Sequence, residues 1–122
     1  MAREPVTRSV DALSVVTEPI FHSALALTEL PPGRMCCVTV AGREVLICRS
    51  RDGVFAVDNI CTHALARMNE GRLRGTRVIC PLHGASFDVR DGRVLGAPAS
   101  RPLSSYPVRV VEGMIEVALE NS

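Results

Sequence analysis

The chain has 122 residues, which is the length of a single domain. Hydrophobic residues make up 47% of it, enough to fill a core, and the formal net charge is +1. Bulk electrostatics therefore gives no indication of binding to nucleic acid or to a membrane surface. No stretch approaches the roughly eighteen apolar residues of a membrane span, and the N-terminus lacks the apolar core of a signal peptide. We expect a cytoplasmic protein with no nucleic-acid or membrane partner.

The five cysteines are an odd number. Secreted disulfide frameworks usually contain an even set. In a reducing compartment, cysteines that lie near histidines indicate metal or redox chemistry instead. This observation directs attention to residues 61–83, which hold two cysteines and two histidines.

The first half of the chain predicts an extension followed by strands. Residues 1–20 carry two prolines, several charges and weak periodicity, so we expect an N-terminal extension there. From Phe21 onward, short β-like runs alternate with turns. The turn signals are Ala41–Gly42 and Arg51–Gly53. The runs predict strands at FHSALAL (21–27), MCCVTV (35–40), EVLICR (44–49) and VFAVD (54–58).

The second half predicts a glycine-rich middle and a final hairpin. Short apolar runs occur at RVIC (77–80) and SFDV (86–89), and YPVRVVEGMIEVALE (106–120) turns at Glu112–Gly113. Short strands at regular spacing predict an all-β fold of stacked antiparallel sheets. We expect residues 21–122 to form one domain, with a subdomain of about 59–100 inserted between its strands.

Two short motifs offer metal ligands. Residues 61–63 read Cys-Thr-His and residues 80–83 read Cys-Pro-Leu-His, with sixteen residues between them. Two Cys and two His suit a tetrahedral zinc ion, and copper usually prefers another ligand balance. They also suit a 2Fe–2S cluster that has two Cys on one iron and two His on the other. Zinc fingers usually keep their Cys in one half and their His in the other, whereas each half here is mixed.

The segments CTH and CPLHG at this spacing, followed by SFDV, resemble the motif of Rieske-type ferredoxins of multicomponent aromatic-ring-hydroxylating dioxygenase systems. The resemblance covers roughly residues 21–119 and implies the Rieske fold with one 2Fe–2S cluster. Carried over by position, Cys61 and Cys80 bind an inner iron. His63 and His83 bind an outer iron near solvent.

The same resemblance implies a function. The protein would be a one-electron carrier between an NAD(P)H-dependent flavin reductase and a terminal oxygenase, with no catalytic site of its own. Both partners would dock transiently at the tip formed by His63 and His83. The alternative is a Rieske-type small subunit of a larger oxidoreductase, such as a nitrite reductase-like enzyme.

Residues absent from the motif predict the reduction potential. Respiratory Rieske proteins, which this chain resembles, add a disulfide between the two loops and place a Ser and a Tyr hydroxyl near the cluster. Here Leu82 occupies a loop position without a thiol, and Ala85 and Phe87 stand at the hydroxyl positions. Ser86 is one residue off and should point the other way in a strand. With fewer hydrogen bonds to sulfur, we expect a potential of about −150 mV.

Other residues near the motif have either a functional or a structural interpretation. Gly84 lets the backbone approach a bridging sulfide. Leu65, Leu82 and Ala85 could form a small apolar docking tip. Pro98 lies in a segment that resembles the cluster-covering loop of the Rieske family, which implies that it excludes water. We expect the remaining cysteines to pack in strands: Cys36, Cys37 and Cys48.

Four arginines lie between the two motifs. They either form a solvated face or a basic patch that steers an acidic partner surface. They are Arg67, Arg72, Arg74 and Arg77.

Overall fold

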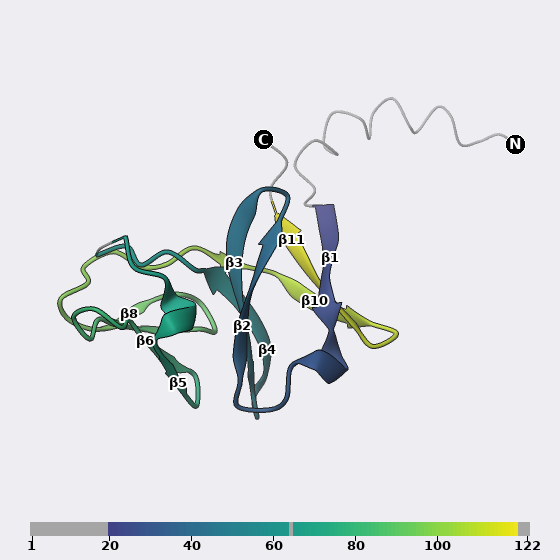
Figure 1. The fold of residues 1–122 in the computed structure, drawn as a ribbon, viewed down its shortest axis with the longest axis horizontal. Coiled ribbons are helices and arrows are strands. Elements are labelled where there is room, and N and C mark those ends of the chain that lie inside the picture. The colour runs from purple at the N-terminus through teal and green to yellow at the C-terminus, as the bar shows by residue number, and fades with distance from the viewer. Residues whose placement is uncertain (1–19, 64, 120–122) are drawn as a thin grey trace, which may run out of the picture.

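The computed structural model describes residues 20–63 and 65–119, which form three antiparallel sheets (Figure 1). These residues contain two short 3-10 helices and no α-helix, and none of their helices is long and apolar enough to span a membrane. The predicted all-β fold class is confirmed. The extension predicted at 1–20 lies outside the described residues apart from Ile20, where the first strand begins.

We call the three sheets outer, central and distal. The outer sheet has the order β1 (Ile20–Ala26), β11 (Met114–Leu119), β10 (Val108–Val111). The central sheet has the order β2 (Met35–Val40), β3 (Arg43–Ser50), β4 (Gly53–Asp58), β9 (Ser105–Tyr106). The distal sheet has the order β5 (Arg72–Arg74), β6 (Arg77–Ile79), β7 (Ser86–Asp88), β8 (Val94–Gly96). The 3-10 helices are η1 (Leu27–Glu29) and η2 (Met68–Glu70).

The predicted hairpins form at the predicted turns. Strand β2 pairs with β3 around Ala41 and Gly42, and β10 pairs with β11 around Glu112 and Gly113. Ala41 and Glu112 both have positive φ, of 49° and 50°. Such left-handed residues belong to two-residue turns whose twist matches that of the flanking strands.

Strand β3 is buried on both of its faces. Val45 and Ile47 belong to an apolar cluster with Ile115 and Val117 of the outer sheet. Leu46 and Cys48 belong to a second apolar cluster, which contains the buried residues of the distal half. The central sheet therefore lies between two layers. A strand covered on both faces needs a continuous apolar run, which explains the sequence VLIC.

The distal sheet is inserted between two neighbouring strands of the central sheet. The chain leaves after β4 and returns at β9, and these strands pair through Ala56 with Tyr106 and Val57 with Ser105. Departure and return therefore lie side by side, and the inserted segment extends to one end of the molecule (Figure 1). The insertion agrees with the predicted architecture. The exact division into an extension, one domain and a subdomain of 59–100 stays a prediction.

Candidate metal centre

Two loops with the same closing hydrogen bond present the predicted ligands. The N–H of Cys61 donates to the carbonyl of Ala66 at 2.9 Å. The N–H of Cys80 donates to the carbonyl of Ala85 at 2.7 Å, again five residues ahead. The first loop follows the central sheet and the second joins β6 to β7. Each cysteine therefore starts a tight loop of the same size, and each histidine lies within it.

The two cysteines form a buried pair. Cys61 is 3% exposed and Cys80 is 2% exposed. Burial raises the pKa of the Cys80 thiol, and the adjacent Cys61 thiol raises it further. The N–H of Leu82 donates toward the Cys80 sulfur and lowers this pKa. The N–H of His83 also donates toward the Cys80 sulfur. Thiolates at this buried place need a positive charge nearby, which a bound metal supplies.

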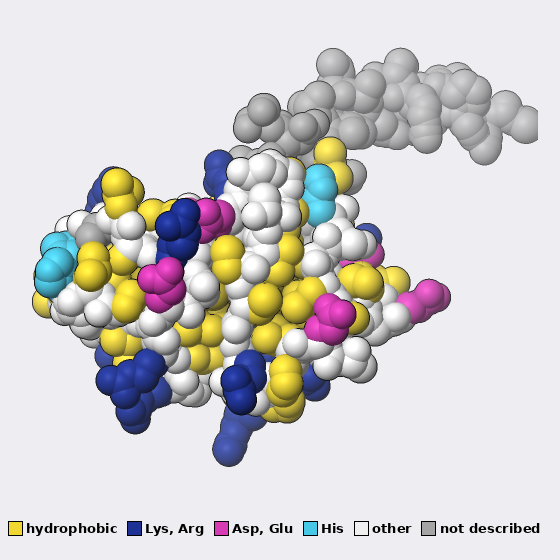
Figure 2. All heavy atoms as spheres, in the orientation of Figure 1, with side chains coloured by type: hydrophobic (Ala, Val, Ile, Leu, Met, Phe, Trp, Pro, Cys, Tyr) yellow, Lys and Arg dark blue, Asp and Glu magenta, His cyan; other side chains and the backbone are white. Residues whose placement is uncertain are grey.

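The two histidines form an exposed pair. The ring centroids of His63 and His83 are 5.2 Å apart, and the ring planes meet at 81°. Both side chains are exposed. Figure 2 shows histidine side chains at the end of the molecule that the distal half forms. Four predicted ligands from distant parts of the chain therefore meet as a buried thiol pair and an outward-facing imidazole pair.

This arrangement fits a binuclear cluster. Among residues 20–63 and 65–119, no three His, Cys, Asp or Glu side chains converge as the ligands of one metal ion do. A Rieske cluster instead takes two Cys on one iron and two His on the other. The donor types, their pairing and their unequal burial all match that division.

Apolar side chains surround the cysteine pair. Ala85, Phe87 and Leu103 are buried in the same apolar cluster as Cys61 and Cys80. The expectation that Ala85 belongs to an exposed docking tip is wrong, because the closing bond from Cys80 folds this residue back beneath the second loop. Leu65 and Leu82 are 92% and 58% exposed, as the docking-tip hypothesis requires.

Two positions at which we expect no hydroxyl group near the cluster, 85 and 87, hold buried apolar side chains. Ala85 and Phe87 are fully buried beside the cysteines and contribute no donor. The Ser86 hydroxyl accepts a hydrogen bond from Nη1 of Arg77 at 2.8 Å. Ser86 is therefore engaged on another side of β7, as the alternation along a strand predicts.

A third loop, residues 97–104 between β8 and β9, is hydrogen-bonded to the first ligand loop. Thr62 donates its hydroxyl to the carbonyl of Arg101 at 2.7 Å, and Arg101 donates back to the carbonyl of Thr62 at 3.5 Å. Ala99 is buried in the apolar cluster of the cysteines, whereas Pro98 is exposed. The sequence predicts that this loop lies near the cluster site, but it does not predict the hydrogen bonds through Thr62 that hold the loop there.

A buried asparagine anchors the first ligand loop to the central sheet. Nδ2 of Asn59 donates to Oδ1 of Asn69 at 2.8 Å and to Oε1 of Glu44 at 3.2 Å, and its Oδ1 accepts from the N–H of Asn69 at 2.9 Å. Arg67 forms an ion pair with Glu44 at 3.1 Å. Sequence reasoning missed this network. Its one signal is an asparagine two residues before the first ligand.

Two glycines shape the second ligand loop. Gly84 has a φ of +80°, and a Cβ there would meet nothing within 4 Å, so the backbone conformation requires glycine. Gly71 packs against the residue preceding Cys80, since a Cβ there would lie 1.9 Å from the carbonyl oxygen of Ile79. Only glycine therefore allows this segment to approach β6 so closely.

The other cysteines pack in strands, as predicted. Cys48 is fully buried, and burial raises its pKa to about 12. Cys36 packs against the apolar cluster between the outer and central sheets. The Cys37 thiol donates to Oε1 of Glu44 at 3.9 Å, and burial raises its pKa. These thiols are free.

Comparison with known proteins identifies the family. Residues 21–107 match the Rieske [2Fe-2S] domain. The ferredoxin component of the naphthalene 1,2-dioxygenase system of Pseudomonas aeruginosa is 44% identical over 71% of this chain and 84% of its own length.

Two solved structures have the same fold. The first is a complex of reduced oxygenase and oxidised ferredoxin in carbazole 1,9a-dioxygenase, with a TM-score of 0.79, 32% identity and coverage of 86% of this chain and 98% of the matching chain. The second is described as a putative NADH-dependent nitrite reductase small subunit from Mycobacterium tuberculosis, with a TM-score of 0.76, 31% identity and coverage of 86% and 99%. The chain therefore belongs to the Rieske [2Fe-2S] family, as an electron-carrying ferredoxin component of dioxygenase systems that holds one 2Fe–2S cluster and is not a catalytic subunit.

Proposed function

We propose that Cys61 and Cys80 bind the inner iron of the cluster, and that His63 and His83 bind the outer iron. The burial of the cysteine pair and the exposure of the histidine pair support this assignment. When bound, the cluster takes up and releases one electron at a time. The loops orient the four ligands through their closing bonds, and the N–H groups of Leu82 and His83 donate toward the inner sulfur.

We propose a reduction potential at the low end of the Rieske range, about −150 mV. Hydrogen bonds to cluster sulfur stabilise the reduced state, whose charge is more negative. The side chains of Ala85 and Phe87 supply no such bond, and the hydroxyl of Ser86 is held by Arg77. A low potential suits transfer from a flavin reductase to an oxygenase.

We propose that the protein carries electrons from an NAD(P)H-dependent flavin reductase to the terminal oxygenase of an aromatic-ring dioxygenase in the cytoplasm. Support comes from the naphthalene-system relative and from the similar ferredoxin in complex with its oxygenase. Both partners would dock at the tip of His63 and His83, where Leu65 and Leu82 supply exposed apolar surface. Transient redox interfaces are small, so a few such side chains suffice.

A role as a small subunit of a nitrite reductase-like enzyme is the second candidate, since one solved structure of that description is similar over most of this chain. The two roles predict different behaviour in solution. A dioxygenase carrier exists free and meets its partners transiently, whereas a structural subunit copurifies in a stable complex.

The test combines spectroscopy with reconstitution. The dithionite-reduced protein should give an electron paramagnetic resonance spectrum with an average g below that of all-Cys clusters, and metal analysis should find about two irons and two sulfides per chain. Added to a flavin reductase, NADH and a panel of ring-hydroxylating oxygenases, the protein should support product formation by at least one. Zinc alone would contradict the ligand assignment, and failure with every oxygenase would contradict the proposed role.

A further inference from the structure

Charge is divided unequally between the two halves of the molecule. Residues 59–103, which include both ligand loops, contain seven arginines and three acidic residues. The other described residues, 20–58 and 104–119, contain five arginines and six acidic residues. The half that carries the cluster site is therefore electropositive, although the whole chain is close to neutral. Such a field acts on any charged surface that approaches the site.

The excess of positive charge is concentrated on the hairpin of β5 and β6. We call its three arginines the arginine hairpin: Arg72, Arg74 and Arg77. Within the described part of the chain, ion pairs hold Arg67, Arg90 and Arg93 of this half, and Arg101 donates to the carbonyl of Thr62, whereas no ion pair is found for the arginine hairpin. The guanidinium of Arg77 donates to the neutral Ser86 hydroxyl, its one side-chain hydrogen bond among residues 20–63 and 65–119. Figure 2 shows basic side chains gathered where Figure 1 places β5.

The pairing within this hairpin has an energetic cost. Arg74 and Arg77 are directly opposed across the two strands. Like charges at opposed positions destabilise an antiparallel pair by a few tenths of a kcal/mol up to about 1 kcal/mol. Stability alone would favour an acidic residue at one of these positions. The arrangement is thus better explained by a negative surface that binds from outside.

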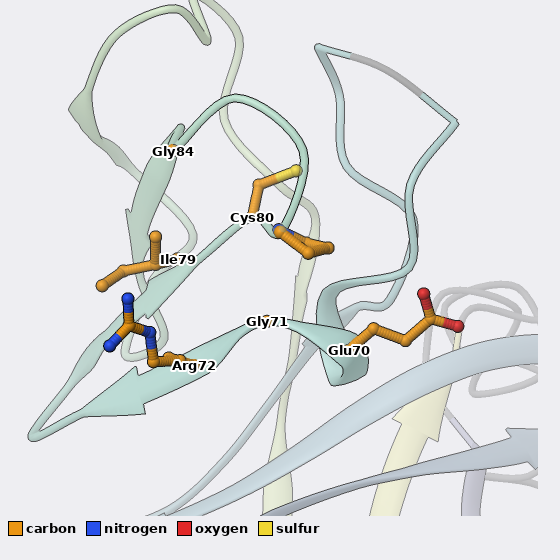
Figure 3. A pocket seen from close by; sticks show the side chains of 7 residues that line it. Glu70, Gly71, Arg72, Ile79, Cys80 and Gly84 are labelled. Atoms are coloured by element: carbon orange, nitrogen blue, oxygen red, sulfur yellow. The ribbon is translucent and has the colours of Figure 1, made fainter.

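A groove connects the arginine hairpin to the second ligand loop. It has a volume of about 360 Å³. Figure 3 shows Arg72 at one side of it and Gly84 at the other, with Ile79 between them, and Pro81 also lines it. Cys80 and Ile79 line its wall. Glu70 also lines the groove, and Figure 3 shows its carboxylate turned away from the Arg72 guanidinium. A chain segment bound here would contact the loop of the inner iron ligand.

We propose that the arginine hairpin and this groove form a docking surface for a carboxylate-rich segment of the terminal oxygenase. The proposal rests on the proposed function, which names that oxygenase as the electron acceptor. All fourteen basic residues of the chain are arginines. The guanidinium group binds a carboxylate through two parallel hydrogen bonds, which lysine cannot do. The surface therefore orients the acidic segment as well as attracting it.

The first experiment measures the local field with small redox probes. Reduced holo-protein is mixed in a stopped-flow instrument with ferricyanide or with hexaamminecobalt(III), each of which takes one electron. The double variant Arg72→Gln with Arg74→Gln should react about threefold or more slowly with ferricyanide and faster with the cobalt complex at low salt. Salt of about 0.5 M should remove both differences, since it shortens the screening length to a few ångströms.

A matched control separates local charge from net charge. The double variant Arg51→Gln with Arg109→Gln loses the same number of charges from the turn between β3 and β4 and from β10. It should change the ferricyanide rate much less. Equal rates for the two double variants would overturn the proposal, as would a ferricyanide rate that does not respond to either.

The second experiment concerns the partner. The double variant Arg72→Lys with Arg74→Lys keeps the charge, so its ferricyanide rate should equal that of the wild type. Its electron transfer to the oxygenase that supports turnover should nevertheless be several-fold slower. If this variant is reduced more slowly by the flavin reductase but passes electrons to the oxygenase at the wild-type rate, the choice of the oxygenase as partner is wrong. If no oxygenase accepts electrons, the proposed function fails, while the ferricyanide comparison still decides whether the arginines act near the site.

Discussion

The rings of His63 and His83 meet edge to face with centroids 5.2 Å apart, although they come from two separate loops. Both loops are closed by a hydrogen bond from the cysteine N–H to the carbonyl five residues ahead. The protein backbone therefore sets the relative position of the two imidazoles. This geometry leads to predictions about the ligands and about the residues that hold them.

Replacing His83 with cysteine should change the character of the cluster. A third thiolate makes the cluster more negative, so the potential should move toward the value of about −400 mV of all-Cys plant-type ferredoxins. Electron paramagnetic resonance of the reduced protein and a redox titration measure the change. His22→Cys in β1 is the control and should keep the Rieske spectrum. An unchanged spectrum in the His83→Cys variant would show that His83 is not a ligand.

Restoring a hydroxyl at position 85 should raise the potential. In the Ala85→Ser variant, the new Oγ lies in the apolar cluster beside Cys61 and Cys80. A hydrogen bond that favours the reduced cluster by about 1.4 kcal/mol raises a one-electron potential by about 59 mV. Protein-film voltammetry measures the shift. Ser86→Ala is the matched control and should leave the potential unchanged, because Arg77 engages that hydroxyl; a shift there of similar size would contradict this explanation.

Asn59→Ala should destabilise the protein and weaken retention of the cluster. The substitution removes all three hydrogen bonds of the fully buried Asn59 side chain, two with Asn69 and one with Glu44. We expect a loss of about 2–4 kcal/mol in the free energy of unfolding, measured by urea denaturation. Arg67→Ala is the comparison, since this ion pair is largely exposed and screened by water, so its loss should cost clearly less. A cost for Asn59→Ala no greater than for Arg67→Ala would disprove the anchoring role.

Gly71→Ala should disturb the second ligand loop. The added Cβ would meet the Ile79 carbonyl at 1.9 Å, so the backbone next to Cys80 must move. We expect a destabilisation of about 1–3 kcal/mol and partial loss of the cluster absorbance. Gly75→Ala has a φ of +62° and open space around it, so it should cost about 1 kcal/mol and leave the absorbance intact. Full cluster content in purified Gly71→Ala protein would count against a role in positioning the loop.

The sequence predicts the hairpins and the ligand set because both depend on local signals. The turns at Ala41–Gly42 and Glu112–Gly113 lie between runs of strand-forming residues. The short strands β5, β8 and β9 were not predicted, since two or three residues are too few to show an alternation. Tertiary contacts decide such segments.

Other features of the site depend on contacts between distant residues. The burial of Ala85 follows from the hydrogen bond that closes its loop, and the residue type alone does not predict it. The anchoring of Asn59 requires Glu44, which approaches from β3. The run VLIC predicts a strand, but only the second apolar layer explains why both of its faces are buried.

The side-by-side departure and return of the chain at β4 and β9 has an evolutionary consequence. A segment whose ends are adjacent can be exchanged as a unit between homologues without rearranging its host. Here, however, Leu46, Cys48 and Val57 of the host pack in the same core as the transplanted part. Recombination at this junction should therefore yield functional chimaeras only when the incoming segment has an apolar face that packs against these host residues. The residues that set the reduction potential and those that stabilise the host are thus expected to be exchanged together.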